Sequence, residues 1–246
     1  MVEAKAVSTP LEQHFKLSSK DSSKDIEESK RMESIPYSNA TGSLMYLIVC
    51  TRPDLAHYSS IVSRYMGNPG RAHWEATKWV FLYLKGLSNR GLLYKHLKSI
   101  ELNLYGYVDS DYAGDLDKRR SLIGFTFVLG GNVISWKSNL QPVVTLSTLE
   151  AESIAMTEAV KETIWLKGIL EELGFYQRSI NITCHSQNAI HLSKNQQFHE
   201  RTKHIDVKLH FIREMIEKRT VKITTVNKHY VPQSKRNSFV KESTIS

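Results

Sequence analysis

Three acidic residues gather at the end of a predicted strand. Leu102, Leu104 and other apolar residues alternate along residues 100–109, and Asp109, Asp111 and Asp115 fall within the next few positions. Carboxylates crowded at one place repel each other, and Mg²⁺ is their usual partner because it prefers hard oxygen ligands. Taken alone, the segment favours a polar turn, in which Asp, Ser and Gly are common. A metal site is the alternative.

A second group of acids lies at the start of a predicted long helix. Ser147 has the residue type of an N-cap, and Glu150 can reach back to its backbone as in a capping box. Glu152 then stays free to point towards the strand ends. Acids in a first helical turn also occur for electrostatic reasons alone. The coincidence of an acidic strand end with an acidic helix start strengthens the functional interpretation.

The elements that must position these acids follow the order βββαβααβ. The predicted elements are strands at 100–109, 123–129 and 133–136, a long helix at 147–173, a strand at 180–184, helices at 187–194 and about 201–218, and a strand at 221–226. This order predicts an α/β fold, a mixed five-stranded sheet with flanking helices. We expect the ends of its first and fourth strands to lie near each other and near the start of the long helix.

The first part of the chain is predicted to be all-helical and separate. Residues 18–34 are rich in Ser, Lys, Asp and Glu, which is typical of a linker or disordered segment. Helical spacing follows at 37–50, then from Pro53 to a stop at 67–70, and at about 71–87.

Composition limits the class of protein. A net charge of +8 and a pI near 9.3 favour polyanionic partners such as nucleic acid. Cys50 and Cys184 cannot form a disulfide framework, so we expect an intracellular location, cytoplasmic or nuclear. No apolar run approaches the roughly 20 residues of a membrane helix, and the N-terminus lacks a signal-peptide pattern.

Several ordered motifs resemble one family. The motifs are Asp109–Ser121, Val133–Ser138, Leu146–Glu152, Arg201–Asp206 and Phe211–Glu214, and, further upstream, Pro36–Ser38, Gly42–Tyr46, Thr51–Asp54, Ser63–Met66, Asn68–Gly70 and His73–Trp74. The later group is similar to the RNase H domain of copia-type retrotransposon polyproteins. The upstream group is similar to the segment that joins reverse transcriptase to RNase H in the same polyproteins.

The resemblance implies an RNase H-like fold that hydrolyses the RNA strand of an RNA/DNA hybrid. In the family, clustered carboxylates hold two Mg²⁺ ions, which neutralise charge on the attacking and leaving oxygens. Asp109 would be the first ligand and Glu152 the second, with Glu150 the weaker alternative for that role. The candidates for binding the hybrid's phosphates are Arg119, Arg120, Lys137, Arg201 and Lys203. For each of these basic residues alone, a solvated surface charge is the alternative.

The chain departs from the family pattern at two positions. His185 stands where the third acid is expected, and imidazole is a poor Mg²⁺ ligand. The fourth acid is expected near Phe239, where the tail offers only Glu242. Because losing one essential member of such a unit can remove most of its catalysis, we expect impaired Mg²⁺ binding and a degenerate nuclease.

The sequence therefore predicts a tail at 1–35, a helical connection segment at 36–98, an RNase H-like domain at 99–230 and a divergent tail at 231–246. The expected function is residual binding of RNA/DNA hybrid or other nucleic acid, with other parts of the polyprotein as further partners. Two alternatives stay open: an active Mg²⁺-dependent ribonuclease H, and a domesticated module that binds protein.

Overall fold

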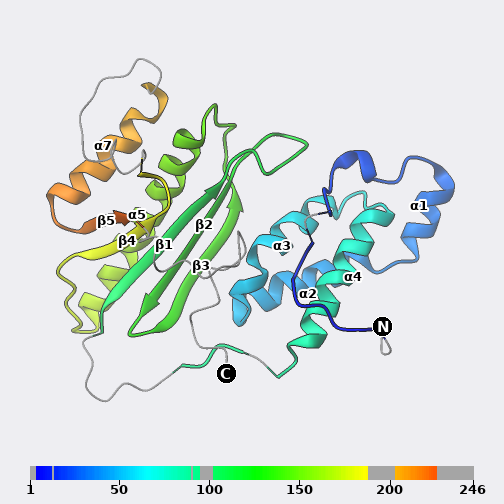
Figure 1. Ribbon diagram of the computed structural model, residues 1–246, viewed down its shortest axis with the longest axis horizontal. Coiled ribbons are helices and arrows are strands. Elements are labelled where there is room, and N and C mark those ends of the chain that lie inside the picture. Colours follow the sequence, from blue (N-terminus) through cyan, green and yellow to red (C-terminus); the bar gives the residue numbers. More distant parts are fainter. Residues whose placement is uncertain (1–3, 13, 90, 95–101, 188–202, 226–246) are drawn as a thin grey trace. The chain divides into compact units, whose positions relative to one another are not determined.

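The computed structural model describes residues 4–12, 14–89, 91–94, 102–187 and 203–225. Within these ranges the chain forms two compact units (Figure 1). The first is built from residues up to Leu92 together with the short loop Asp115–Lys118, and the second from the remaining described residues. No helix in the described ranges is both long and apolar enough to cross a bilayer.

The first unit is helical. Its elements are η1 (Ser19–Asp21), α1 (Ile26–Glu33), α2 (Tyr37–Cys50), η2 (Pro53–Leu55), α3 (Ala56–Val62), η3 (Ser63–Tyr65) and α4 (Arg71–Gly86). The helix α2 has the predicted bounds. The single helix predicted after Pro53 is instead divided into η2, α3 and η3, and α4 ends one residue earlier than predicted.

The helix α1 lies inside the segment for which the composition predicted a linker. The Asp25 carboxylate caps it by accepting a hydrogen bond of 2.8 Å from the Glu28 backbone N–H. Acids occupy its first turn and Lys30 and Arg31 its last, which is the favourable arrangement for the helix dipole. Only Met32 is buried. A charged composition with so little apolar content concealed these local signals.

A buried histidine ties the first unit together. The apolar core contains Leu44, Leu55 and Val62. Beside this core, the His73 ring stacks on Tyr65 at 3.9 Å between centroids. Its Nδ1 accepts a hydrogen bond from the Gly70 N–H at 2.9 Å, and its Nε2 lies 3.1 Å from the Ser18 carbonyl oxygen. Burial lowers the pKa of His73, so the neutral ring accepts at one nitrogen and donates at the other.

The second unit is a five-stranded mixed sheet. Its strands are β1 (Leu104–Asp111), β2 (Leu122–Leu129), β3 (Asn132–Leu140), β4 (Ile180–Cys184) and β5 (Val221–Thr225), in the order β3-β2-β1-β4-β5. The pairs β1–β2 and β2–β3 are antiparallel, and β1–β4 and β4–β5 are parallel. The strands β1 and β3 continue further at their C-terminal ends than predicted. The first two residues of the predicted first strand lie outside the described ranges.

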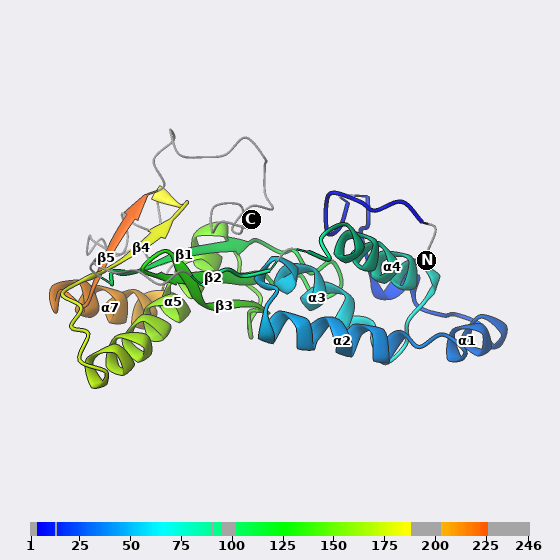
Figure 2. The ribbon, with the colours of Figure 1, turned by 90° about the horizontal axis from the view of Figure 1, so that it is seen from below.

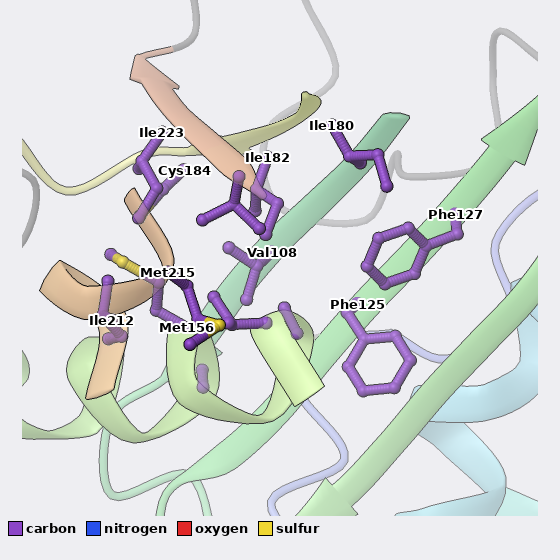
Figure 3. Close-up of a cluster of buried hydrophobic side chains, with 14 of the residues drawn as sticks. Val108, Phe125, Phe127, Met156, Ile180, Ile182, Cys184, Ile212, Met215 and Ile223 are labelled. Carbon is purple, nitrogen blue, oxygen red and sulfur yellow. The ribbon is translucent and has the colours of Figure 1, made fainter. Parts of the chain in front are cut away.

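Two helices cover one face of this sheet. They are α5 (Thr148–Glu172) and α7 (Lys203–Glu217), which lie on the same side of it in Figure 2. Figure 3 shows Met156 of α5 and Ile212 of α7 packed beneath the strand residues Val108 and Ile182. All of these side chains are fully buried. Of the predicted helix at 187–194, every residue after Gln187 lies outside the described ranges. The expected fold class, an RNase H-like mixed sheet with flanking helices, is confirmed.

Gly106 permits a close contact in the centre of the sheet. It pairs with Phe127 across β1 and β2, and a Cβ atom at Gly106 would lie 2.5 Å from Phe127 Cε1. The Phe127 ring is fully buried and packs edge-on against Phe125 at 5.7 Å, so it cannot move aside. The β1–β2 pairing therefore requires glycine at this position.

We expect Gly106→Ala to lower the free energy of unfolding by about 1–3 kcal/mol, as overpacking of a rigid core does. Gly168→Ala is the matched control, because Gly168 lies inside α5 and, apart from the surrounding helix backbone, no atom lies within 4 Å of its would-be Cβ. This control should raise stability by about 0.5–1 kcal/mol. Urea unfolding followed by circular dichroism measures both. Equal effects of the two variants would contradict the packing argument.

Candidate active site at the ends of β1 and β4

The parallel pairing of β1 with β4 brings two of the predicted site residues together. Val108 pairs with Cys184, so Asp109 and His185 are the next residues on neighbouring strands that run in the same direction. Asp109 is half-buried and His185 is exposed. Their charges interact, because His185 acts to lower the pKa of Asp109. The expected meeting of the first and fourth strand ends is observed.

Glu152 comes to the same place from the first turns of α5. Its Oε2 accepts a hydrogen bond from the Cys184 thiol at 3.7 Å, and it lies close enough to Asp109 for the two charges to interact. The Cys184 sulfur in turn accepts the Ser186 N–H at 3.4 Å. The structure thus gathers Asp109, Glu152 and Cys184 at the ends of β1 and β4.

Glu150 has a different role, at the start of α5. Its buried carboxylate accepts the Leu146 N–H at 2.7 Å, and its own N–H donates to Ser147 Oγ at 3.1 Å. These bonds resemble those of a capping box, displaced by one residue at the N-terminal end. Of the two acids that the sequence left as alternatives, Glu152 is the one that faces Asp109.

Burial and like charge both act on the gathered acids. Burial raises the pKa of Glu152 to about 7, with the nearby Asp109 charge adding to the effect. Burial also raises the pKa of Asp109, although a hydrogen bond from the Ser110 backbone N–H and, to a smaller extent, the charge of His185 oppose this. The Cys184 pKa is raised to about 12, first by burial and then by Glu152. Two ionised carboxylates in this buried position are poorly solvated and repel each other. Binding of a proton or a cation is therefore favoured.

Asp111 acts on this group through its charge, which contributes to raising the pKa of Asp109. It is the exposed last residue of β1, and its Oδ2 lies where a Cβ atom at Gly114 would have to be. Ala113 follows in the left-handed region with φ of 52°. This geometry fits the polar turn that the sequence offered as an interpretation of the segment.

The predicted phosphate-binding residues are unequal in their surroundings. Arg119 is exposed and Arg120 half-buried, in the loop between β1 and β2. Lys137 Nζ on β3 lies 3.6 Å from Glu158 and 5.9 Å from the centre of the Phe125 ring. Arg201 lies outside the described ranges, and Lys203 is described only as the first residue of α7. These five residues therefore stay predictions.

The donor set does not fit a pair of Mg²⁺ ions. In the part of the chain that the structure describes, no three His, Cys, Asp or Glu residues lie together in a way that could hold a metal ion. Asp109 and Glu152 supply carboxylates, but the residue beside them at the end of β4 is His185, whose imidazole suits softer metals. The place expected for a fourth acid, near Phe239, lies outside the described ranges.

One buried residue beside the site has no counterpart in the sequence analysis. Gln141 follows β3 directly, is fully buried, and donates from its side-chain amide to the Ala151 carbonyl and to Ser110 Oγ. A glutamine next to Pro142 at a strand end gives no sequence signal for burial. Only the three-dimensional packing of α5 against β1 identifies it.

Comparison with curated proteins finds related polyproteins. The chain is 50% identical over 232 residues to the retrovirus-related Pol polyprotein from transposon TNT 1-94 of Nicotiana tabacum, covering 94% of the chain and 17% of that protein. It is 35% identical over 230 residues to the corresponding polyprotein from transposon RE1 of Arabidopsis thaliana, covering 93% and 15%. The chain thus spans about a sixth of the length of these polyproteins.

A shorter relative is matched over almost its whole length. It is the secreted RxLR effector protein 161 of Plasmopara viticola, which is 42% identical over 135 residues, 55% of this chain and 94% of that protein. No family model matches the chain.

Solved structures with similar folds are distant in sequence. RNase H1 from Halobacterium salinarum NRC-1 aligns with a TM-score of 0.37 and 16% identity, covering 52% of this chain and 87% of that one. The foamy viral protease-reverse transcriptase in complex with dsDNA aligns with a TM-score of 0.47 and 12% identity, covering 86% and 43%.

The raised pKa of Glu152 predicts how stability depends on pH. In the folded protein this carboxyl keeps its proton up to about pH 7, whereas the unfolded chain releases it near 4.5. The contribution of Glu152 to stability is therefore lost as pH rises from about 4.5 through 7. We expect Glu152→Gln to be more stable than the wild type at pH 8, with a smaller difference at pH 4.5, in urea unfolding experiments.

Glu158 on the same helix is the matched control with the opposite sign. Burial alone would raise the pKa of Glu158, but Lys161 and Lys137 outweigh burial and lower it. Glu158→Gln should therefore cost stability at pH 8 and less at low pH. If both variants respond to pH in the same direction, the electrostatic account of Glu152 is wrong.

Proposed function

Since the chain belongs to the family of copia-type retrotransposon Pol polyproteins, we propose that its RNase H-like unit binds RNA/DNA hybrid without cleaving it efficiently. The family's ribonucleases H typically use Mg²⁺, held by clustered carboxylates. The proposal for this chain is a unit that keeps the fold and part of the site and has lost most of the catalysis.

His185 is the observation that carries this proposal. It follows β4 directly, beside Asp109, and the family resemblance expects a third carboxylate at this position. An imidazole there supplies no negative charge, and in its protonated form it adds a positive one. Each lost carboxylate reduces the negative charge that holds Mg²⁺. In addition, the pKa values of the two acids that are present, Asp109 and Glu152, are raised. A protonated carboxyl group is a weak ligand for a hard cation.

Hybrid binding does not depend on these ligands. Affinity for nucleic acid comes largely from contacts between basic side chains and phosphates, which release counterions. Arg119 and Arg120 lie in the loop that follows the end of β1, and the chain carries a net charge of +8. Binding can therefore persist when the carboxylate cluster is incomplete.

The domain limits given above are part of this proposal. We assign 36–98 to a helical connection segment after reverse transcriptase and 99–230 to the RNase H-like domain. The two cysteines are free thiols, Cys50 exposed and Cys184 buried, which supports an intracellular location.

A cleavage assay tests the loss of catalysis. Labelled RNA/DNA hybrid is incubated with the wild type, Asp109→Asn and His185→Asp in the presence of Mg²⁺, and RNA fragments are quantified on a gel. We expect no product above the Asp109→Asn background for the wild type, because removal of one essential member of such a unit can lower the rate by ~10⁴-fold or more. His185→Asp should yield more product than the wild type. Robust cleavage by the wild type, abolished by Asp109→Asn, would contradict the proposed loss of catalysis and support an active ribonuclease H.

A binding titration tests the second half of the proposal. We expect the double substitution Arg119→Ala and Arg120→Ala to weaken retention of hybrid and to reduce the salt dependence of binding by about one unit per lost phosphate contact. Lys137→Ala should have a smaller effect, because Glu158 already pairs with Lys137. Lys222→Ala, an exposed substitution on β5 with the same change of charge as Lys137→Ala, is the control for loss of a single positive charge. No retention of hybrid by the wild type would contradict binding and favour the protein-interaction alternative.

A further inference from the structure

Gln141 occupies the space between β1, β3 and the first turns of α5. It is the first residue after β3 and has no exposed surface. Its backbone N–H donates to the Ser121 carbonyl oxygen at 2.8 Å, which fixes the main chain beside β2. The side chain then extends from this fixed point towards the candidate site.

The side-chain amide of Gln141 joins the two elements that carry the gathered acids. Its Nε2 donates to the Ala151 carbonyl oxygen at 2.8 Å and lies 3.3 Å from Ser110 Oγ. Ala151 directly precedes Glu152, and Ser110 directly follows Asp109. One nitrogen atom therefore connects the immediate chain neighbours of both acids.

The hydrogen atoms available are consistent with this bridge. The single hydroxyl proton of Ser110 is donated to the Leu122 carbonyl oxygen at 2.9 Å, so its oxygen can accept the second proton of the Gln141 amide. The Ala151 carbonyl has two lone pairs, so it can accept from Gln141 beside its bond within the helix. Ser110 is thus held from two sides, by β2 and by Gln141.

A purely structural role explains this residue poorly. Gln141 Oε1 is buried and has no hydrogen-bond partner among the described residues. A buried polar atom without a partner is destabilising, and an apolar side chain of equal length would fill the same space without it. What the amide provides, and an apolar side chain cannot, is the pair of directed bonds from Nε2.

We propose that Gln141 is a positioning residue that fixes Glu152 of α5 against Asp109 of β1 by tying Ala151 to Ser110. This role rests on the proposed function in one respect, the identity of Asp109 and Glu152 as the site. The geometric claim itself concerns only the separation of the two acids.

The test is Gln141→Met, which keeps the length and volume of the side chain and removes both donors. With the tie gone, the first turns of α5 can move from β1, so Glu152 becomes better solvated and more distant from Asp109. The titration midpoint of Glu152, followed by ¹³C NMR of its carboxyl carbon, should fall from about 7 by at least about one unit towards its ordinary value.

Thr157→Val is the matched control. Thr157 is buried on the same helix and donates to the Ser153 carbonyl oxygen at 2.8 Å, so this variant also removes one bond to a helix carbonyl. It should leave the Glu152 midpoint unchanged even if stability falls. An unchanged midpoint in folded Gln141→Met, or an equal shift in both variants, would overturn the proposal.

A second variant covers the case in which Gln141→Met does not fold. Ser110→Ala removes only the weaker of the two anchors, and it should shift the Glu152 midpoint in the same direction by a smaller amount. No shift in Ser110→Ala would then overturn the proposal. Failure of the wild type to retain hybrid would contradict the proposed function alone, since the titration needs no nucleic acid.

Discussion

Two parallel strands that lie side by side end at the same edge of a sheet, and in this chain those strands are β1 and β4. Their register, with Val108 opposite Cys184, determines that Asp109 and His185 are neighbours. The helix α5 packs against β1 and β4 through Met156 and adjacent apolar residues, and this packing brings its second acid to the same edge. The site is therefore a consequence of strand direction and of one buried helix face.

The buried surroundings of the site disfavour the negative charges of Asp109 and Glu152. Burial raises the pKa of both Asp109 and Glu152, and their mutual repulsion raises that of Glu152 further. Such an arrangement costs stability unless a cation or a proton balances the charge. The bond from Cys184 to Glu152 and the tie through Gln141 hold the acids together despite this cost.

Strong local patterns gave most of the fold from sequence. The helix α2 and the strand β4 have the predicted bounds because apolar periodicity and clear stops agree there. The helix α1 was missed because its signals are an Asp25 cap and ordered charges instead of an apolar face. The prediction of one continuous helix after Pro53 was wrong, because apolar periodicity alone does not distinguish an unbroken helix from short helical turns that follow one another.

The site was predictable only where its residues carry chemistry in their side-chain type. Asp109 and Glu152 are acids near predicted element ends, so the sequence could bring them together. The sequence alone could not decide whether Glu150 or Glu152 faces Asp109. The structure decides it, because the Glu150 carboxylate accepts the Leu146 N–H at the start of α5. Gln141 could not be inferred, because its role comes from contacts to residues 31 positions before and 10 positions after it.

Under the proposed function, His185 stands in place of an acid, and this changes more than the ligand count. A third carboxylate beside Asp109 would add to the repulsion at this edge, whereas His185 lowers the pKa of Asp109. The same substitution that weakens a Mg²⁺ site therefore relieves the electrostatic cost of the site when no metal is bound. The apolar core of the sheet, α5 and α7 makes no use of these acids, so the fold does not require the missing charge. The proposed loss of metal ligands is therefore compatible with an intact fold, because neither Asp109 nor Glu152 belongs to the apolar core that supports the strand ends.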